Sequence, residues 1–187
     1  MLTSANTGST RVFGVTCRLR TRSTHALIWG FPRGRATPAR DTVDMTDATP
    51  MQIQVTIDAA RAHHLADWWA ETLGWEVEPQ DEGFIRSMIE QGFATEADTE
   101  THRGALVWRG TTAINSPDGP RILFQDVPEE KAGKNRMHLD LRPPEGVDLD
   151  ELRTELESRG ARRIGSGQQG PHSWVVFADP EGNEFCL

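Results

Sequence analysis

The sequence has few cysteines, no long apolar run and few basic residues in its C-terminal part. Only Cys17 and Cys186 occur among 187 residues, and two cysteines in regions of different composition provide no disulfide framework. This pattern favours a reducing compartment, so we expect a cytoplasmic protein. The apolar stretch at residues 26–31 is far shorter than the roughly 18–20 residues of a membrane span, and no membrane partner is expected.

Charge is distributed unevenly along the chain. Residues 1–44 carry seven Arg and only two acidic residues, Asp41 and Asp44, whereas residues 45–187 hold 13 Lys and Arg against 26 Asp and Glu. Nucleic-acid binding needs a basic surface that neutralises phosphates. The acidic C-terminal part therefore argues against a nucleic-acid partner.

The N-terminal segment shows no sustained hydrophobic period. Residues 1–44 are rich in Arg, Thr, Ser and Gly, bury too little apolar surface to offset their chain entropy, and are predicted to be disordered. Two other interpretations stay open: an organellar transit peptide, or a spurious extension upstream of a true start at Met45 or Met51. All three place residues 1–50 outside the functional domain, which is predicted to span residues 51–187.

The first half of this domain begins with a strand and a helix. Residues 51–58 alternate apolar and polar side chains, which predicts a strand with two different faces. Asp58 is the expected N-cap of the following helix, and Gly74 its left-handed C-cap. Further strands are predicted at residues 75–79, 105–115 and 121–127.

Residues 80–104 interrupt the strand pattern. They contain a short helix with an apolar stripe around Ile85, followed by an acidic, Thr-rich loop through His102. The segment is either a surface insertion that covers the core or a lid over a pocket. The sequence leaves this choice open.

The second half repeats the order of the first. Alternation over residues 136–142 predicts a strand, and an amphipathic helix then ends at Gly160. Strands follow at residues 161–165, 173–178 and 184–187, with a flexible hairpin at the glycines of residues 165–170. Each half therefore predicts one strand, one helix and three strands, which indicates an internal repeat.

The C-terminal turn and strand, residues 179–187, have a degenerate copy at residues 116–124. At an offset of 63 the prolines, acidic residues and glycines of the two copies coincide, and Leu123 falls on Cys186. The closing glycines of the two helices instead give an offset of 86. That offset places His138 on Gln52, and a small insertion or deletion would place it on Gln54.

A doubled βαβββ module resembles the vicinal oxygen chelate superfamily, which includes glyoxalase I, bleomycin-resistance proteins and extradiol dioxygenases. Residues 179–187, 121–129 and 134–141 and the segment Leu73-Gly74-Trp75 are similar to its glyoxalase-like branch. The resemblance covers about residues 51–187. It implies an α+β fold in which two tandem modules, residues 51–128 and 135–187, form a cupped mixed sheet with helices outside. It also implies a small-molecule cleft between the modules, and a homodimer fits the same family.

In metal-dependent members of this superfamily, four ligands come from the first and last strands of each module. Carried over to this sequence, these places fall on Gln52 or Gln54, Leu123, His138 and Cys186. Leu123 cannot coordinate a metal, and a Gln amide oxygen is a weak neutral ligand. His138 and Cys186 alone are too few, because a catalytic zinc site uses three protein ligands. We therefore expect no glyoxalase-type metal and no other cofactor.

The candidate ligand contacts lie on the polar strand face and on the strands opposite. The residues predicted to contact a small molecule are Gln52, Gln54, Trp108, His138, Asp140 and Cys186. His138 is also the candidate acid–base residue, with Asp140 two residues further along the same strand. Cys186 is either a nucleophile paired with His138 or a small buried hydrophobic residue.

Other polar residues are predicted to face solvent. His63, His64 and Asp67 have a helical spacing that suits a metal site, but the same helix buries an apolar face, so these three are expected on its solvated side. His102 is assigned to a loop. Arg159 is assigned to the solvated face of the second helix.

The sequence thus predicts a protein that binds or sequesters a small organic molecule in the cleft between two modules, without the glyoxalase metal. The alternative is an enzyme of the same superfamily, either a lyase or isomerase with His138 as acid–base or a metal-dependent member. A third class, a purely structural dimerisation module, would leave no cavity. Fold and function are only loosely tied, so the ligand is not identified.

Overall fold

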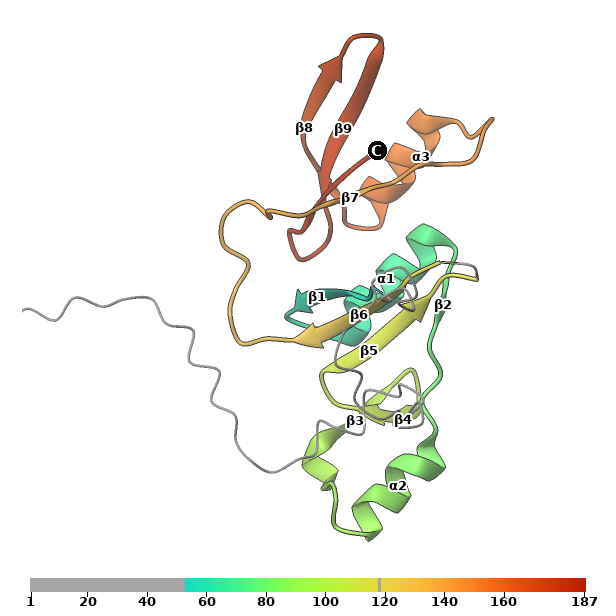
Figure 1. The fold of residues 1–187 in the computed structure, drawn as a ribbon, viewed down its shortest axis with the longest axis vertical. Helices are drawn as coiled ribbons and strands as arrows, with labels where there is room; N and C mark the ends of the chain where they lie inside the picture. The colour runs from blue at the N-terminus through green and yellow to red at the C-terminus, as the bar shows by residue number, and fades with distance from the viewer. Residues whose placement is uncertain (1–52, 118) are drawn as a thin grey trace, which may run out of the picture. The chain divides into compact units, whose positions relative to one another are not determined.

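The computed structural model describes residues 53–117 and 119–187, so the predicted N-terminal extension and Gln52 lie outside the described residues. Module one contains β1 (Val55–Ala59), α1 (Ala62–Leu73), β2 (Glu76–Val77), α2 (Glu82–Glu90), the 3-10 helix η2 (Glu96–Asp98), β3 (Thr99–His102), β4 (Ala105–Trp108), β5 (Thr111–Asn115) and β6 (Arg121–Asp126). Module two contains β7 (Leu139–Asp140), α3 (Leu149–Ser158), β8 (Arg162–Gln169), β9 (His172–Ala178) and β10 (Glu184–Cys186) (Figure 1). The predicted α+β class is confirmed.

The two modules have the same strand order. Module one forms a four-stranded sheet in the order β1-β6-β5-β2, and module two forms one in the order β7-β10-β9-β8. In each, the first strand pairs in parallel with the last, while the other pairs are antiparallel. A parallel pair needs a long crossover connection, and α1 or α3 lies within that connection. Both sheets are mixed, as the repeat predicts.

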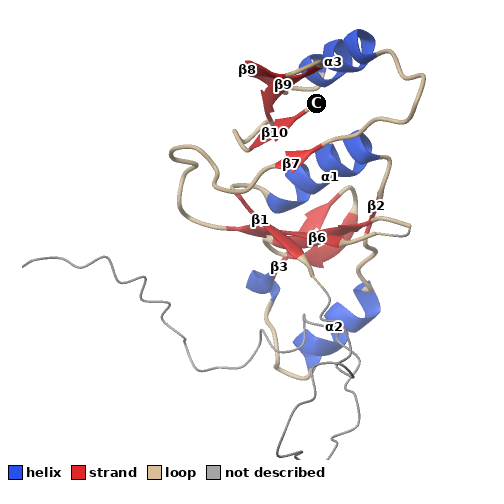
Figure 2. Ribbon diagram, turned by 45° about the horizontal axis from the view of Figure 1, so that its top comes forward, coloured by secondary structure: helices blue, strands red, loops and turns tan. Residues whose placement is uncertain are grey.

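Helix α1 carries the largest side chains of the core. Leu65, Trp68 and Trp69 are 2%, 8% and 1% exposed. The Trp69 ring meets the ring of Phe185 edge-on at 5.2 Å between centroids, so α1 contacts β10 of module two through this pair. Helix α1 also contacts β5 and β6, and Figure 2 shows it beside the sheet that contains β1 and β6. The helix ends at Gly74, whose φ of 65° gives the predicted left-handed cap.

The start of α1 differs from the prediction. Asp58 is not the N-cap, because it belongs to β1 and the helix begins four residues later, at Ala62, with Arg61 in the N-cap position. The carboxylate of Glu181 instead accepts hydrogen bonds from the backbone N–H groups of Ala60 at 2.6 Å and Arg61 at 3.0 Å. Asp126 accepts one from the first helical residue at 2.6 Å. Distant carboxylates therefore satisfy these N–H groups.

Arg159 joins α3 to α1, which corrects its assignment to a solvated face. Its side chain is 15% exposed, and its Nη2 donates to the backbone oxygen of Trp68 at 2.9 Å and to Oγ1 of Thr72 at 2.8 Å. The guanidinium carbon also lies 5.4 Å from the centre of the Trp68 ring. Stacking on an aromatic face and donating in a plane are both properties of arginine.

The insertion after β2 is more ordered than predicted. The assignment of His102 to a loop is wrong, because β3 pairs antiparallel with β4 through the two-residue turn Arg103-Gly104. Both turn residues have a positive φ, 50° and 83°, as a tight hairpin turn requires. The predicted strand at residues 105–115 is interrupted by Gly110, with φ 67°, so that β4 and β5 belong to different sheets.

Module two keeps the predicted order with different strand lengths. Only Leu139 and Asp140 of the predicted strand at residues 136–142 pair with β10, because β10 itself has three residues. Strands β8 and β9 form a long hairpin that includes the glycines of residues 165–170, as predicted. No helix in residues 53–117 or 119–187 has the length and apolar character needed to cross a membrane.

Candidate functional site

The parallel pair β7–β10 brings three reactive side chains together. Cys186 is the register partner of Asp140, and His138 lies two residues before Asp140, a spacing that places both side chains on one face of an extended chain. His138 Nε2 lies 3.3 Å from Asp140 Oδ1. One ligand atom from each of the three residues lies within 4.8 Å of the others. His138, which immediately precedes β7, and Asp140 on β7 are therefore in contact.

The members of this cluster differ in exposure and in proton affinity. The side chains of His138 and Asp140 are 39% and 61% exposed, whereas Cys186 is half-buried. Burial raises the pKa of the Cys186 thiol, and the negative charge of Asp140 and a hydrogen bond to it raise it further, against a smaller opposing effect of Lys134. The thiol is therefore protonated near pH 7, which weakens the interpretation of Cys186 as a free nucleophile.

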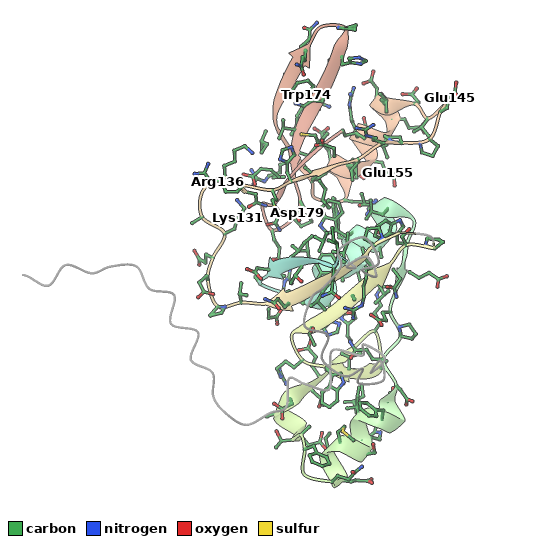
Figure 3. The ribbon with its side chains drawn as sticks, in the orientation of Figure 1. Lys131, Arg136, Glu145, Glu155, Trp174 and Asp179 are labelled. Carbon is green, nitrogen blue, oxygen red and sulfur yellow. The ribbon has the colours of Figure 1, made fainter. Side chains whose placement is uncertain are left out.

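The segment before β7 is fastened to β10. Lys131 and Arg136 lie on this segment, which joins β6 to β7 (Figure 3). Glu184 Oε2 accepts a hydrogen bond from the backbone N–H of Asn135 at 3.0 Å and lies 3.4 Å from Lys131 Nζ. These contacts hold the chain three residues before His138 against the strand that carries Cys186.

The corresponding place in module one is occupied differently. Thr56 is the register partner of Leu123, just as Asp140 is of Cys186. With Leu123 superposed on Cys186, the counterpart of His138 is Gln54, the second of the two residues that the repeat allowed.

In module one, the polar side chains around Gln54 form hydrogen bonds and an ion pair with one another. Gln54 Oε1 accepts a hydrogen bond of 2.5 Å from Arg121 Nη1, and Arg121 also forms an ion pair with Glu78 at 2.6 Å. Leu123 is 7% exposed and apolar. This half offers a hydrogen-bonded network and a hydrocarbon side chain in place of metal ligands.

Trp108 lies in a different part of module one. It is half-buried on β4. Its backbone N–H donates to Gln80 Oε1 at 2.7 Å, and its backbone carbonyl oxygen lies 2.9 Å from His63 Nε2. Its backbone thus anchors the hairpin β3–β4. Of the six predicted contact residues, His138, Asp140 and Cys186 come together in module two. Gln54 and Trp108 lie in different parts of module one, and Gln52 lies outside the described residues.

A second polar cluster forms where the hairpin β3–β4 meets α1. The prediction that His63, His64 and Asp67 all lie on the solvated side of the helix is wrong for this cluster. His63 is buried at 5% exposed, Asp67 is half-buried with 14% of its side chain exposed, and only His64 faces solvent. His102 Nε2 lies 2.7 Å from Asp67 Oδ2, and the His102 ring stacks on His63 at 5.0 Å between centroids. Arg103 pairs with the same carboxylate at 2.9 Å. The i, i+4 spacing of His63 and Asp67 was the available signal.

A pocket of about 610 Å³ lies beside this second cluster, and its lining includes Asp67, Glu71, Trp75 and Arg103. It is open to solvent and formed by α1, β2 and the β3–β4 turn. The pocket lining does not include the three residues of the β7–β10 cluster. We place the candidate site at that cluster, because it concentrates ligand and acid–base groups, whereas the carboxylate of Asp67 already has two cationic or polar partners.

Comparison with known families gives one decisive match. The family model described as "Glyoxalase-like domain" matches residues 54–187. The chain belongs to the glyoxalase-like domain family. This places it in the vicinal oxygen chelate superfamily, as the sequence resemblance predicts.

Solved structures with related folds share little sequence with this glyoxalase-like domain. The fosfomycin resistance protein FosX from Mesorhizobium loti is 10% identical, covers 75% of this chain and 91% of its own, and gives a TM-score of 0.48. The bleomycin-binding protein from Streptomyces verticillus, in complex with copper(II)-bleomycin, is 14% identical, covers 74% and 95%, and scores 0.41. A glyoxalase/bleomycin resistance protein/dioxygenase family enzyme from Burkholderia phytofirmans is 15% identical, covers 71% and 93%, and scores 0.46. Comparison with curated proteins gives no significant match.

The four places that the superfamily uses for metal ligands do not fit a metal in this glyoxalase-like domain. Of Gln54, Leu123, His138 and Cys186, the first has its amide oxygen engaged by an arginine and the second is apolar. An arginine guanidinium beside a ligand oxygen also opposes a divalent cation. Within residues 53–117 and 119–187, His138, Asp140 and Cys186 of the β7–β10 cluster are the group that can still offer donor atoms to one ion.

Proposed function

We propose that this glyoxalase-like domain binds a small organic molecule on the polar face of β7 and β10, in the cleft between its two modules. The observation that carries the proposal is the cluster of His138, Asp140 and Cys186, whose ligand atoms lie within 4.8 Å of one another. An imidazole, a carboxylate and a thiol together offer hydrogen-bond donors and acceptors. A few convergent polar groups of this kind typically orient a small ligand.

Exposure supports a binding role for this cluster. His138 and Asp140 keep 39% and 61% of their side chains exposed, while the segment that leads to them is anchored to β10 through the hydrogen bond from Asn135 to Glu184. Groups that are accessible but held in place suit recognition, because little ordering accompanies binding. Gln54 and Arg121 would line the module-one part of the same cleft.

A thermal-shift screen against metabolites and antibiotics tests the proposal. A ligand present at 100 times its Kd stabilises the folded state by about 2.7 kcal/mol, which raises Tm by several degrees. His138→Ala is expected to abolish the shift. His172→Ala, which changes an exposed histidine on β9, is the matched control and is expected to keep it. An identical shift in wild type and His138→Ala would remove His138 from the site.

An enzymatic function is the second candidate. It is favoured by the distance of 3.3 Å between His138 Nε2 and Asp140 Oδ1, since a carboxylate that orients an imidazole is a common acid–base arrangement. Such a pair would suit proton abstraction in a lyase or isomerase reaction. Exchange of the carbon-bound protons of a bound ligand with solvent deuterium, followed by NMR, would reveal this proton abstraction. His138→Ala should slow the exchange by about 10²–10⁴-fold. Equal exchange rates in both proteins would exclude this role.

We also propose that the protein is cytoplasmic and forms a homodimer, as predicted from the sequence. Several apolar side chains are exposed in the single chain, among them Met137 at 81% and Ile164 at 47%, and a second copy would cover surface of this kind. Light scattering coupled to size-exclusion chromatography distinguishes the two states. A mass of one chain at micromolar concentration would contradict the dimer.

A further inference from the structure

We propose that His138, Asp140 and Cys186 form a three-donor site for one divalent transition metal of the Zn²⁺ or Co²⁺ type, built by module two alone. This inference extends the function proposed above, since it rests on the same three side chains. It differs from the four-place metal site of the superfamily in using Asp140 and no ligand from module one. The count of two good ligands that argued against a metal becomes three once the strands are paired.

The distances between donors suit a small ion. Donors at 2.0–2.3 Å from a tetrahedral zinc ion lie about 3.3–3.8 Å from one another. The His138–Asp140 separation of 3.3 Å already falls in this range, and all three ligand atoms lie within 4.8 Å of one another. Because His138 and Asp140 are partly exposed, rotation of their side chains is sufficient to bring the set closer.

The chemistry of the donors selects the type of ion. A thiolate and an imidazole favour Zn²⁺ and its neighbours, whereas Mg²⁺ and Ca²⁺ prefer sets made of oxygen atoms. Binding of the ion to Cys186 releases the thiol proton to solvent, and the resulting thiolate and the Asp140 carboxylate balance the two positive charges. Three protein ligands leave a coordination position open for water or a substrate atom.

The charges around the cluster are mixed. Lys134 places a positive charge near Cys186, which repels a cation. Lys131 is already paired with Glu184 at 3.4 Å, so its charge is largely neutralised. The guanidinium of Arg121 donates a hydrogen bond to Gln54 and forms an ion pair with Glu78 in module one. Near Cys186, the thiolate and the carboxylate therefore face the positive charge of Lys134. Lys134 forms no ion pair with a carboxylate within residues 53–117 and 119–187.

Cobalt substitution tests this site directly. The untagged full chain, stripped with a chelator, is titrated with Co²⁺, and a thiolate-to-cobalt charge-transfer band in the near ultraviolet should rise to one equivalent per chain. Cys186→Ala should abolish the band. The matched control is Cys17→Ser, which removes the other cysteine of the sequence and should leave the band unchanged. A band that persists in Cys186→Ala, or no band in the wild type, overturns the proposal.

Affinity measurements assign the other two ligands. In calorimetric titrations with Zn²⁺, His138→Ala and Asp140→Asn should each weaken binding by at least about tenfold, since even indirect partners of a metal contribute 10–100-fold. His172→Ala should bind as the wild type does. Unchanged affinity in Asp140→Asn would reduce the set to two ligands and contradict the three-donor site.

A labelling experiment avoids dependence on variants that fold poorly. In the wild type, one equivalent of Zn²⁺ should slow alkylation of Cys186 at least about tenfold, as followed by mass spectrometry of the C-terminal peptide, whereas Mg²⁺ should not. The thermal-shift screen with chelated protein separates this inference from the proposed function. Ligand binding without metal leaves the proposed function intact and, together with unprotected Cys186, overturns the metal site alone.

Discussion

The indole Nε1 of Trp69 donates a hydrogen bond of 3.0 Å to Oδ2 of Asp179, 110 residues further along the chain. Asp179 is completely buried, and its other oxygen accepts hydrogen bonds from the backbone N–H groups of Glu181 at 3.0 Å and Asn183 at 2.9 Å. One carboxylate thus closes the C-terminal turn and fixes the central tryptophan of the core. A buried charge is stable only when it is hydrogen-bonded in this way.

Replacement of Asp179 should be strongly destabilising. Asp179→Ala leaves the Trp69 indole and two backbone N–H groups without their acceptor, and each unsatisfied buried donor costs about 1–3 kcal/mol. We expect a loss of about 3 kcal/mol or more in urea unfolding. Asp58→Ala is the control, because Asp58 is exposed and accepts a single hydrogen bond from Gln125. Similar losses in both variants would contradict the special role of Asp179.

Glu181 should stabilise α1 from a distance of 120 residues. Its carboxylate binds two N–H groups at the start of the helix, where a negative charge also interacts favourably with the helix dipole. Glu181→Ala is expected to lower the free energy of unfolding by about 1 kcal/mol. Glu157→Ala, at the other end of a different helix, should change it by less than half as much. Equal effects would mean that the cap contributes nothing.

The hairpin β3–β4 should loosen locally when its contact with α1 is removed. His102→Ala removes the 2.7 Å contact with Asp67 and the stacking on His63. We expect amide hydrogen exchange in β3 and β4 to accelerate about tenfold while the core strand β6 is unchanged, because regions of a fold can open independently. His64→Ala, which alters the exposed neighbour, is the control. Uniform acceleration through both modules would show that the hairpin belongs to the global unfolding unit.

Stability at acid pH should depend on Glu184. Burial alone raises the pKa of Glu184, but the hydrogen bond from the Asn135 N–H and the charge of Lys131 lower the pKa overall, below its ordinary value of 4.5. A carboxyl group with a lowered folded-state pKa contributes stability that is fully present above about pH 4.5 and is lost as the pH falls through the folded-state value. Glu184→Gln should therefore be about 1 kcal/mol less stable than the wild type at pH 7. This difference should shrink below pH 4.5, as measured by chemical denaturation across pH.

A comparison with Glu130→Gln, an exposed residue on the same segment, controls for the change in net charge. That variant should follow the wild type at every pH. If the deficit of Glu184→Gln were the same at pH 3 and pH 7, the ion pair with Lys131 would not be its cause.

The elements governed by local periodicity could be predicted from the sequence. Gly74 ends α1 in the left-handed conformation, and the C-terminal turn correctly aligned Leu123 with Cys186, since both occupy the same register position in their sheets. Turn residues and alternation act over a few positions, so a single sequence displays them. The same local logic placed His138 and Asp140 on one face of β7.

The features governed by distant contacts could not be predicted. His63 is buried and Asp67 half-buried where they meet His102, which lies 35 residues after Asp67 on a hairpin in the insertion. Arg159 is half-buried and reaches Trp68 across 91 residues. No hydrophobic period links such partners. The apolar stripe of α1 identifies only one covered face, whereas the hairpin β3–β4 covers a second, polar one. The approach of Cys186 to Asp140 was likewise visible only when β7 and β10 were paired.

The capping of α1 by Glu181 has a consequence for the order of folding during synthesis. The backbone N–H groups of Ala60 and Arg61, just before α1, donate to Glu181, and the indole of Trp69 donates to Asp179. While the ribosome is still translating module two, module one must expose part of its largest aromatic cluster. Nascent chains that stop before residue 179 should therefore be bound by chaperones, and should be released once the last turn has emerged from the exit tunnel.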